Sequence, residues 1–163
     1  MAAYSLVVFM DWLIQMFADY GYLGMGLLAF LSGSIVPITS EVLLVFFLSL
    51  GLNAVWLTLV ATFGNTLGGV TCFLVGMLAD KEKVLKMFKI TPRRMSRADR
   101  IIQKYGYWAA AISFVPVIGE TLLVMLGIMR VSWWKVALVM AAGKLVRYTF
   151  ITISYTGVMQ LID

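Results

Sequence analysis

One short pattern occurs twice in the chain: a proline, three residues, a glutamate, one residue, and then Leu-Leu-Val. The copies span residues 37–45 and 116–124, and they use two of the three prolines and two of the three glutamates. Tyr-Gly-Tyr precedes each copy, and a glycine follows each glutamate at the same spacing. Scarce residues rarely align twice by chance. The chain is therefore predicted to contain two copies of one unit, as membrane transporters often do.

The rest of the chain is too apolar for a soluble domain, with 62% apolar and 13% charged residues. We expect an integral membrane protein in which residues 1–163 form a single membrane domain. Histidine is absent and Cys72 is the only cysteine, which argues against disulfides, most metal sites and histidine-dependent catalysis. No metal, no cofactor and no enzymatic activity are expected.

Positive charge is concentrated in residues 80–104, which hold nine cations and three acids. A basic patch can bind nucleic acid, but in a membrane protein it is typical of a cytoplasmic loop, and anionic headgroups attract such a loop to the surface. We therefore predict a basic cytoplasmic loop and no nucleic-acid partner. Ahead of it, residues 1–19 place Asp11, Gln15 and Asp19 on one helical stripe, which favours an interfacial helix over a spanning helix.

Two later segments, residues 54–79 and 132–162, are long and apolar enough to be spanning helices. In the first, the spacing of Gly64 and Gly68 permits a close helix–helix approach.

Residues 22–52 and 106–129 are each too short for two full spans. Each segment is therefore either one kinked span or a re-entrant hairpin, with Pro37 or Pro116 at its tip. Irregular backbone at membrane depth must be buried in protein or face water, so a pair of hairpins would define a polar cavity.

The hairpin alternative gives each unit a single crossing, and the two copies then have opposite orientations. The predicted fold is an all-α integral membrane protein with an inverted repeat of re-entrant hairpin plus transmembrane helix, preceded by the interfacial helix. Repeat 1 covers residues 20–79 and repeat 2 covers residues 105–163. Two kinked spans would instead produce parallel copies.

Four ionisable residues lie deep in apolar sequence: Glu41, Glu120, Lys144 and Arg147. A charge near the bilayer centre costs about 2.5–3.5 kcal/mol on insertion scales. Helix rise places Lys144 near the membrane midplane, at the depth predicted for Glu120.

Two further polar residues join this candidate site. Asn65 is the repeat equivalent of Lys144, and Arg130 lies at the cytoplasmic interface. The charges either form buried ion pairs that fix the packing, or they bind an anion at Lys144 and Arg147 while Glu41 or Glu120 takes a proton.

With these residues the chain resembles the DedA superfamily, also known as the SNARE-associated Golgi protein or VTT-domain superfamily, and its short bacterial YqaA-like branch. The resemblance covers about residues 20–157. It is carried by the Pro37…Glu41 tip, residues 64–68 (GNTLG), 97–100 (RADR) and 116–120 (PVIGE), Gly127-x-x-Arg130 and Gly143-Lys144-x-x-Arg147-Tyr148.

The resemblance implies two re-entrant hairpins in an inverted repeat, an acid in the membrane that matches Glu41, basic residues needed for activity, and lipid translocation or scrambling. Some bacterial relatives recycle undecaprenyl phosphate or move phosphatidylethanolamine, with proton-motive force implicated. One departure is clear. Better-known members carry arginines around the second tip proline, where this chain has Ser113 and Gly119.

The leading hypothesis is a lipid transporter or flippase of the bacterial inner membrane. It would be a multi-pass, proton-coupled protein that moves a phospholipid or polyprenyl-phosphate headgroup past the midplane charges. A proton- or cation-coupled carrier of small solutes and a non-transporting scaffold are the alternatives. Membrane lipids and protons are the expected partners, together with a second copy of the chain in a homodimer.

Overall fold

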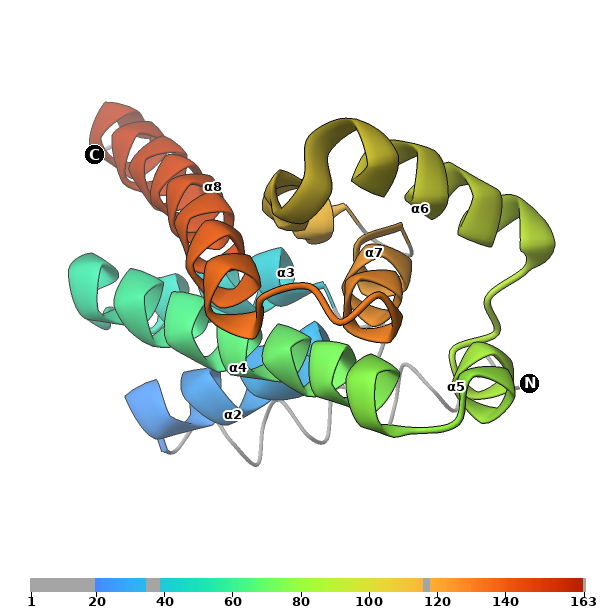
Figure 1. The fold of residues 1–163 in the computed structure, drawn as a ribbon. Coiled ribbons are helices and arrows are strands. Elements are labelled where there is room, and N and C mark those ends of the chain that lie inside the picture. The colour runs from blue at the N-terminus through green and yellow to red at the C-terminus, as the bar shows by residue number, and fades with distance from the viewer. Residues whose placement is uncertain (1–19, 35–38, 116–117, 163) are drawn as a thin grey trace, which may run out of the picture.

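The computed structural model describes residues 20–34, 39–115 and 118–162, and the regular structure in these ranges is entirely helical. The elements are α2 (Tyr22–Gly33), α3 (Ser40–Ser49), α4 (Ala54–Leu78), α5 (Lys81–Met87), α6 (Pro92–Tyr105), the 3₁₀ helix η1 (Gly106–Phe114), α7 (Ile118–Ile128) and α8 (Trp133–Ile162) (Figure 1). The predicted all-α class is confirmed. The predicted interfacial helix at residues 1–19 and both tip prolines, Pro37 and Pro116, lie outside the described residues.

Two of these helices, α4 and α8, are long and apolar enough to cross a membrane. They contain 25 and 30 residues, which at 1.5 Å per residue correspond to about 37 and 45 Å, against ~30 Å of hydrocarbon. Asn53 caps α4, because its Oδ1 accepts hydrogen bonds from the backbone N–H groups of Val55 (3.0 Å) and Trp56 (3.3 Å). Helices long enough to span a membrane are therefore present at both predicted positions.

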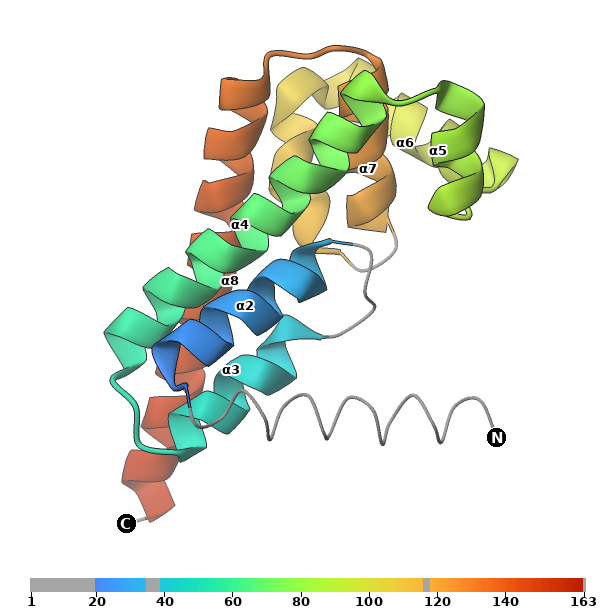
Figure 2. The same ribbon diagram turned by 90° about the horizontal axis from the view of Figure 1, so that it is seen from below.

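The short apolar helices α2 and α3 lie side by side against α4 (Figure 2). Glycines bring α2 close to α4: a Cβ atom added to Gly64 would overlap the carbonyl oxygen of Gly26, and one added to Gly68 would overlap that of Phe30. Two helix backbones can touch in this way only where the residue that faces the neighbouring carbonyl has no side chain. The close approach predicted from the spacing of Gly64 and Gly68 is thus confirmed.

The second short pair, η1 and α7, lies toward the opposite end of the long helices (Figure 2). On α7, a Cβ atom added to Gly127 would overlap the carbonyl oxygen of Phe73 on α4. The 3₁₀ helix η1 packs on α8 instead, where an added Cβ on Gly143 would lie 2.8 Å from the carbonyl oxygen of Ala111. The two arms of this pair therefore contact different long helices.

The basic segment, expected as a connecting loop, contains the helices α5 and α6. Asp80 Oδ1 caps α5 by accepting from the N–H groups of Glu82 (3.0 Å) and Lys83 (3.2 Å). Thr91 Oγ1 accepts from the N–H of Arg94 (3.4 Å) at the start of α6. Local capping and an apolar stripe that packs on α7 and η1 favour helix here despite the high charge.

Two apolar clusters form the core. One is built on α2, α3 and the first half of α4 and extends on α4 to Ala61. The other is built on α6, η1, α7 and the second half of α4, with Cys72 as its first buried α4 residue. On α8 the second cluster contains Val136 and Met140, and the first contains Tyr148. Asn65 and Lys144 therefore lie at the boundary between the two clusters.

Candidate functional site

The first interaction at this boundary is an ion pair between Arg147 on α8 and Glu41 on α3, formed by Nη2 and Oε1. Both side chains are partly covered, with 27% and 24% of their surface exposed. Glu41 lies in the first turn of α3, where the helix dipole favours a negative charge. A carboxylate from one copy of the repeat is thus neutralised by a guanidinium from the other.

The neighbouring residues form a second link between the same helices. Tyr148 is fully buried, and its hydroxyl donates a hydrogen bond to Ser40 Oγ at 2.7 Å. Two consecutive residues of α8 thereby hold two consecutive residues of α3. A buried phenol without a partner would be destabilising, so Ser40 fixes where the start of α3 meets α8.

Lys144 lies one turn before Arg147 and Tyr148 and is 5% exposed. Its Nζ donates a hydrogen bond to the backbone oxygen of Asn65 on α4. In the part of the chain that the structure describes, no carboxylate lies within ion-pair distance of Lys144. This buried cation is held by a neutral oxygen, and it retains donor capacity for an anion.

Glu120 lies on a different helix from the residues of this group. It lies in the first turn of α7 and is partly buried, and it forms no ion pair with any residue in the described ranges. Glu120 was expected to meet Lys144 because the two residues are predicted to lie at the same depth. In the described ranges, Lys144 instead contacts Asn65.

Arg130 lies apart from both groups. It is exposed in the turn between α7 and α8, with φ of 51°, and its N–H donates to the carbonyl of Gly127 at 2.8 Å. The candidate site residues that the structure brings together are therefore Glu41, Asn65, Lys144 and Arg147. With Ser40 and Tyr148, we call this group the polar layer.

Ser40 and Tyr148 were not among the predicted site residues, although the sequence holds a signal for one of them. Lys144, Tyr148 and Thr152 recur at intervals of four in α8 and so share one helix face. Thr152 also faces inward, because its Oγ1 lies 2.8 Å from Thr58 Oγ1 on α4. A polar stripe within an apolar spanning helix marks the face that packs against protein.

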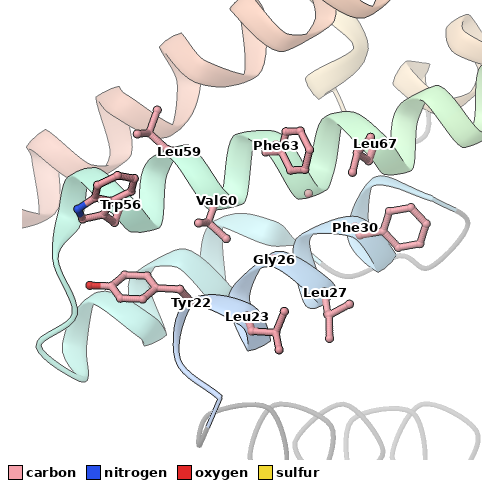
Figure 3. Close-up of a pocket in the computed structure, with 11 residues that line it drawn as sticks. Tyr22, Leu23, Gly26, Leu27, Phe30, Trp56, Leu59, Val60, Phe63 and Leu67 are labelled. Atoms are coloured by element: carbon pink, nitrogen blue, oxygen red, sulfur yellow. The ribbon is translucent and has the colours of Figure 1, made fainter.

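On another face of the molecule, an apolar groove of about 730 Å³ runs between α2 and α4 (Figure 3). Gly26 and Gly64 lie among its lining residues because the two backbones are in contact there. The lining residues are Tyr22, Leu23, Gly26, Leu27, Phe30, Trp56, Leu59, Val60, Phe63, Gly64 and Leu67. The lining residues carry no charge and offer almost entirely apolar contacts, so the groove suits the hydrocarbon chains of lipids.

The described ranges contain no group of three or more His, Cys, Asp or Glu side chains that could hold a metal ion. The chemistry available to the polar layer is ion pairing, hydrogen bonding and proton exchange at a carboxylate.

The sequence is similar to several known proteins. It is 36% identical to the inner membrane protein YqaA of Escherichia coli over 74% of this chain and 80% of that protein. It is 32% identical to a protein of Haemophilus influenzae over 74% of this chain and 78% of the relative. An alkaline phosphatase-like protein of Lactococcus lactis is 24% identical over 92% of this chain and 87% of its own length.

No solved structure matches the chain. The VTT domain matches residues 36–157, a range that includes α3, α4 and the whole polar layer. Together with the relative in Escherichia coli, this match shows that the chain belongs to the VTT-domain family of membrane proteins, the DedA superfamily.

Proposed function

We propose that the chain is a lipid transporter of the bacterial inner membrane that binds the phosphate of a phospholipid or polyprenyl phosphate at Lys144 and Arg147. The observation that carries the proposal is Lys144, a buried cation whose described partner is a neutral backbone oxygen. A cation removed from water is destabilising unless an anion or several acceptors compensate it. A lipid phosphate would supply that compensation. The location is supported by the inner-membrane relative in Escherichia coli.

The architecture proposed with this function is an inverted repeat of two re-entrant hairpins, α2–α3 and η1–α7. It is supported by the contact between Lys144 and Asn65, which are equivalent residues of the two copies. Equivalent residues of two units related by a two-fold axis can contact each other only near that axis. A substrate site on such an axis suits alternating access, because each unit can open toward its own side.

In the proposed cycle, the arriving phosphate takes the place of Glu41 on Arg147, and Glu41 accepts a proton. A carboxylate that loses its cation in a low-dielectric site favours its neutral form. When the phosphate leaves, Glu41 releases the proton and pairs with Arg147 again. Substrate movement would in this way be coupled to proton movement.

The apolar groove between α2 and α4 provides a path for the acyl chains in this proposal. Several of its residues are exposed, among them Leu23 and Leu27 on α2 and Phe63 on α4 (Figure 3). The headgroup would then travel through the polar layer while the chains stay in hydrocarbon. That division suits a small protein, because only the charged part of the substrate needs shelter from the bilayer.

The test is transport of a headgroup-labelled phospholipid or polyprenyl phosphate by purified protein in liposomes, with and without a pH gradient. Lys144→Met should reduce the rate about tenfold or more, since a charge-assisted hydrogen bond contributes about 1.5–3 kcal/mol. Lys83→Gln removes an exposed cation from α5 and serves as the matched control with normal transport. Normal transport by a correctly folded Lys144→Met protein would refute the headgroup site.

The same liposomes separate the other functions. Ion flux or solute uptake without lipid movement would favour the small-solute carrier. Release of phosphate from the labelled lipid would favour an enzyme. A scaffold would show neither, and its partner binding would tolerate both Lys144→Met and Arg147→Gln.

A further inference from the structure

Helix α6 has two distinct faces. Ala98 and Ile102 are buried, and the helix packs on α7 and η1. The cations Arg93, Arg97, Arg100 and Lys104 are all exposed. Their spacing of four, three and four residues places them on one stripe of the helix. The protein therefore covers the apolar side of α6 and leaves a row of positive charge uncovered.

In the part of the chain that the structure describes, no acid pairs with this stripe. The acid of α6 is Asp99, which lies outside the stripe and accepts a hydrogen bond from Gln103 Nε2 at 2.8 Å. Within the described ranges, the stripe residues form no ion pairs. Like charges at helical spacings of three and four repel one another, and an external anion would relieve that repulsion.

Aromatic side chains place the stripe at the level of the lipid headgroups. Lys104 Nζ lies 5.1 Å from the centre of the Tyr105 ring, and Lys135 Nζ lies 5.4 Å from the ring centres of Tyr107 and Trp134. Trp108 is 59% exposed close by in the sequence. Trp and Tyr gather where the bilayer meets water, and Lys reaches out to the same level.

The orientation of α6 agrees with this position. Figure 1 shows α7 nearly end-on while α6 lies across the view, so the two helices cross steeply. Figure 2 places α6 beside the end of the molecule where α4 ends and α8 begins. A helix that crosses a membrane-embedded neighbour at this level runs along the membrane surface.

We propose that the stripe of Arg93, Arg97, Arg100 and Lys104 is a docking surface for the anionic phospholipid headgroups of the leaflet next to α6. Charge complementarity identifies the partner, since anionic lipids attract basic segments near the surface. Because α6 also packs on η1 and α7, bound headgroups would hold the second short pair in place from outside. The inference requires membrane embedding and does not depend on lipid transport.

The test uses the full chain in nanodiscs of phosphatidylcholine, with or without phosphatidylglycerol. Hydrogen exchange of the α6 amides is followed by mass spectrometry. Phosphatidylglycerol should slow exchange across α6, and added salt should weaken the protection because it screens exposed charge. Equal exchange in the two kinds of disc would overturn the proposal.

Matched variants separate the stripe from charge in general. Arg93→Gln/Arg97→Gln/Arg100→Gln should abolish the effect of phosphatidylglycerol. Lys81→Gln/Lys83→Gln/Lys86→Gln removes three exposed cations from α5, where they do not share one stripe, and should preserve it. The same loss in both variants would overturn the assignment to α6.

Two further measurements test for misfolding of the triple variant and for binding of a soluble anion. Arg97→Gln alone, which leaves the buried face of α6 intact, should weaken the protection if the triple variant misfolds. Inorganic phosphate added to phosphatidylcholine discs should leave α6 exchange unchanged. Protection by phosphate alone would point to a soluble anion and refute a lipid surface.

Discussion

Arg147 on α8 forms an ion pair with Glu41 on α3 and thereby joins the second copy of the repeat to the first. The copies are offset by 79 positions, as Glu41 and Glu120 show. By that offset, the equivalent of Arg147 is Gly68, which has no side chain to offer Glu120. Gly68 instead admits the backbone of α2. The two copies of the sequence pattern therefore differ in charge at the polar layer.

The topology of the first short pair is the first prediction. A re-entrant α2–α3 hairpin places Tyr20 and Leu50, both exposed, on the same non-cytoplasmic side, whereas one kinked span places them on opposite sides. Single cysteines at Tyr20 and Leu50, in a Cys72→Ala background, should therefore react equally with an impermeant maleimide from outside. Lys86→Cys on α5 is the cytoplasmic control, and opposite labelling of Tyr20→Cys and Leu50→Cys would exclude the hairpin.

The ion pair predicts strong coupling between two substitutions. Glu41→Gln or Arg147→Gln alone should lower the free energy of unfolding by about 1–3 kcal/mol, between the values for exposed and buried pairs. The double variant should lose less than the sum of the two, because neither charge is left alone. Denaturant unfolding in detergent measures this cycle. Additive losses would mean that the pair contributes nothing as a pair.

The bond from Tyr148 to Ser40 predicts an unequal effect of its two partners. Ser40→Ala leaves a buried phenol without an acceptor and should lower stability by about 1–3 kcal/mol. Tyr148→Phe removes the phenol oxygen and should lower it by about 1 kcal/mol. The double variant should resemble Tyr148→Phe alone in thermal unfolding. A greater loss in Tyr148→Phe than in Ser40→Ala would contradict this account.

Helix contacts predict which glycines tolerate a methyl group. Gly64→Ala and Gly127→Ala push a Cβ into a neighbouring carbonyl oxygen and should each lower stability by about 1–3 kcal/mol. Gly157→Ala on α8 meets nothing within 4 Å and should be neutral or slightly stabilising, because alanine favours helix. Melting temperatures of the three variants give the comparison, and a tolerant Gly64 would place the α2–α4 contact in doubt.

The proposed coupling predicts that the carboxylates control the pH dependence of transport. Glu41→Gln cannot exchange a proton, so its rate should become less sensitive to pH than that of the wild type. Glu120→Gln tests the other acid in the same assay. A normal pH profile of transport in both variants would contradict the proposed proton coupling, but it would not contradict headgroup binding at Lys144 and Arg147.

Much of the fold could be predicted because its signals are local. Two apolar runs long enough to span a bilayer fixed α4 and α8 in place, and glycine spacing indicated the tight contact at Gly64. The helices of the basic segment could not be predicted from net charge, because charge indicates the side of the membrane and not the secondary structure. The local signals for these helices are the single capping residues Asp80 and Thr91.

The sequence by itself determined a membrane protein with an all-helical fold and a set of charges deep in apolar segments, because composition and hydropathy need no knowledge of packing. Only the tertiary structure decided their partners. Depth along a helix places Lys144 and Glu120 at similar levels, but contact also depends on the direction in which each helix face points. Glycines on α4 bring α2 and α7 close to it, and α8 then turns Arg147 to Glu41 and Lys144 to Asn65.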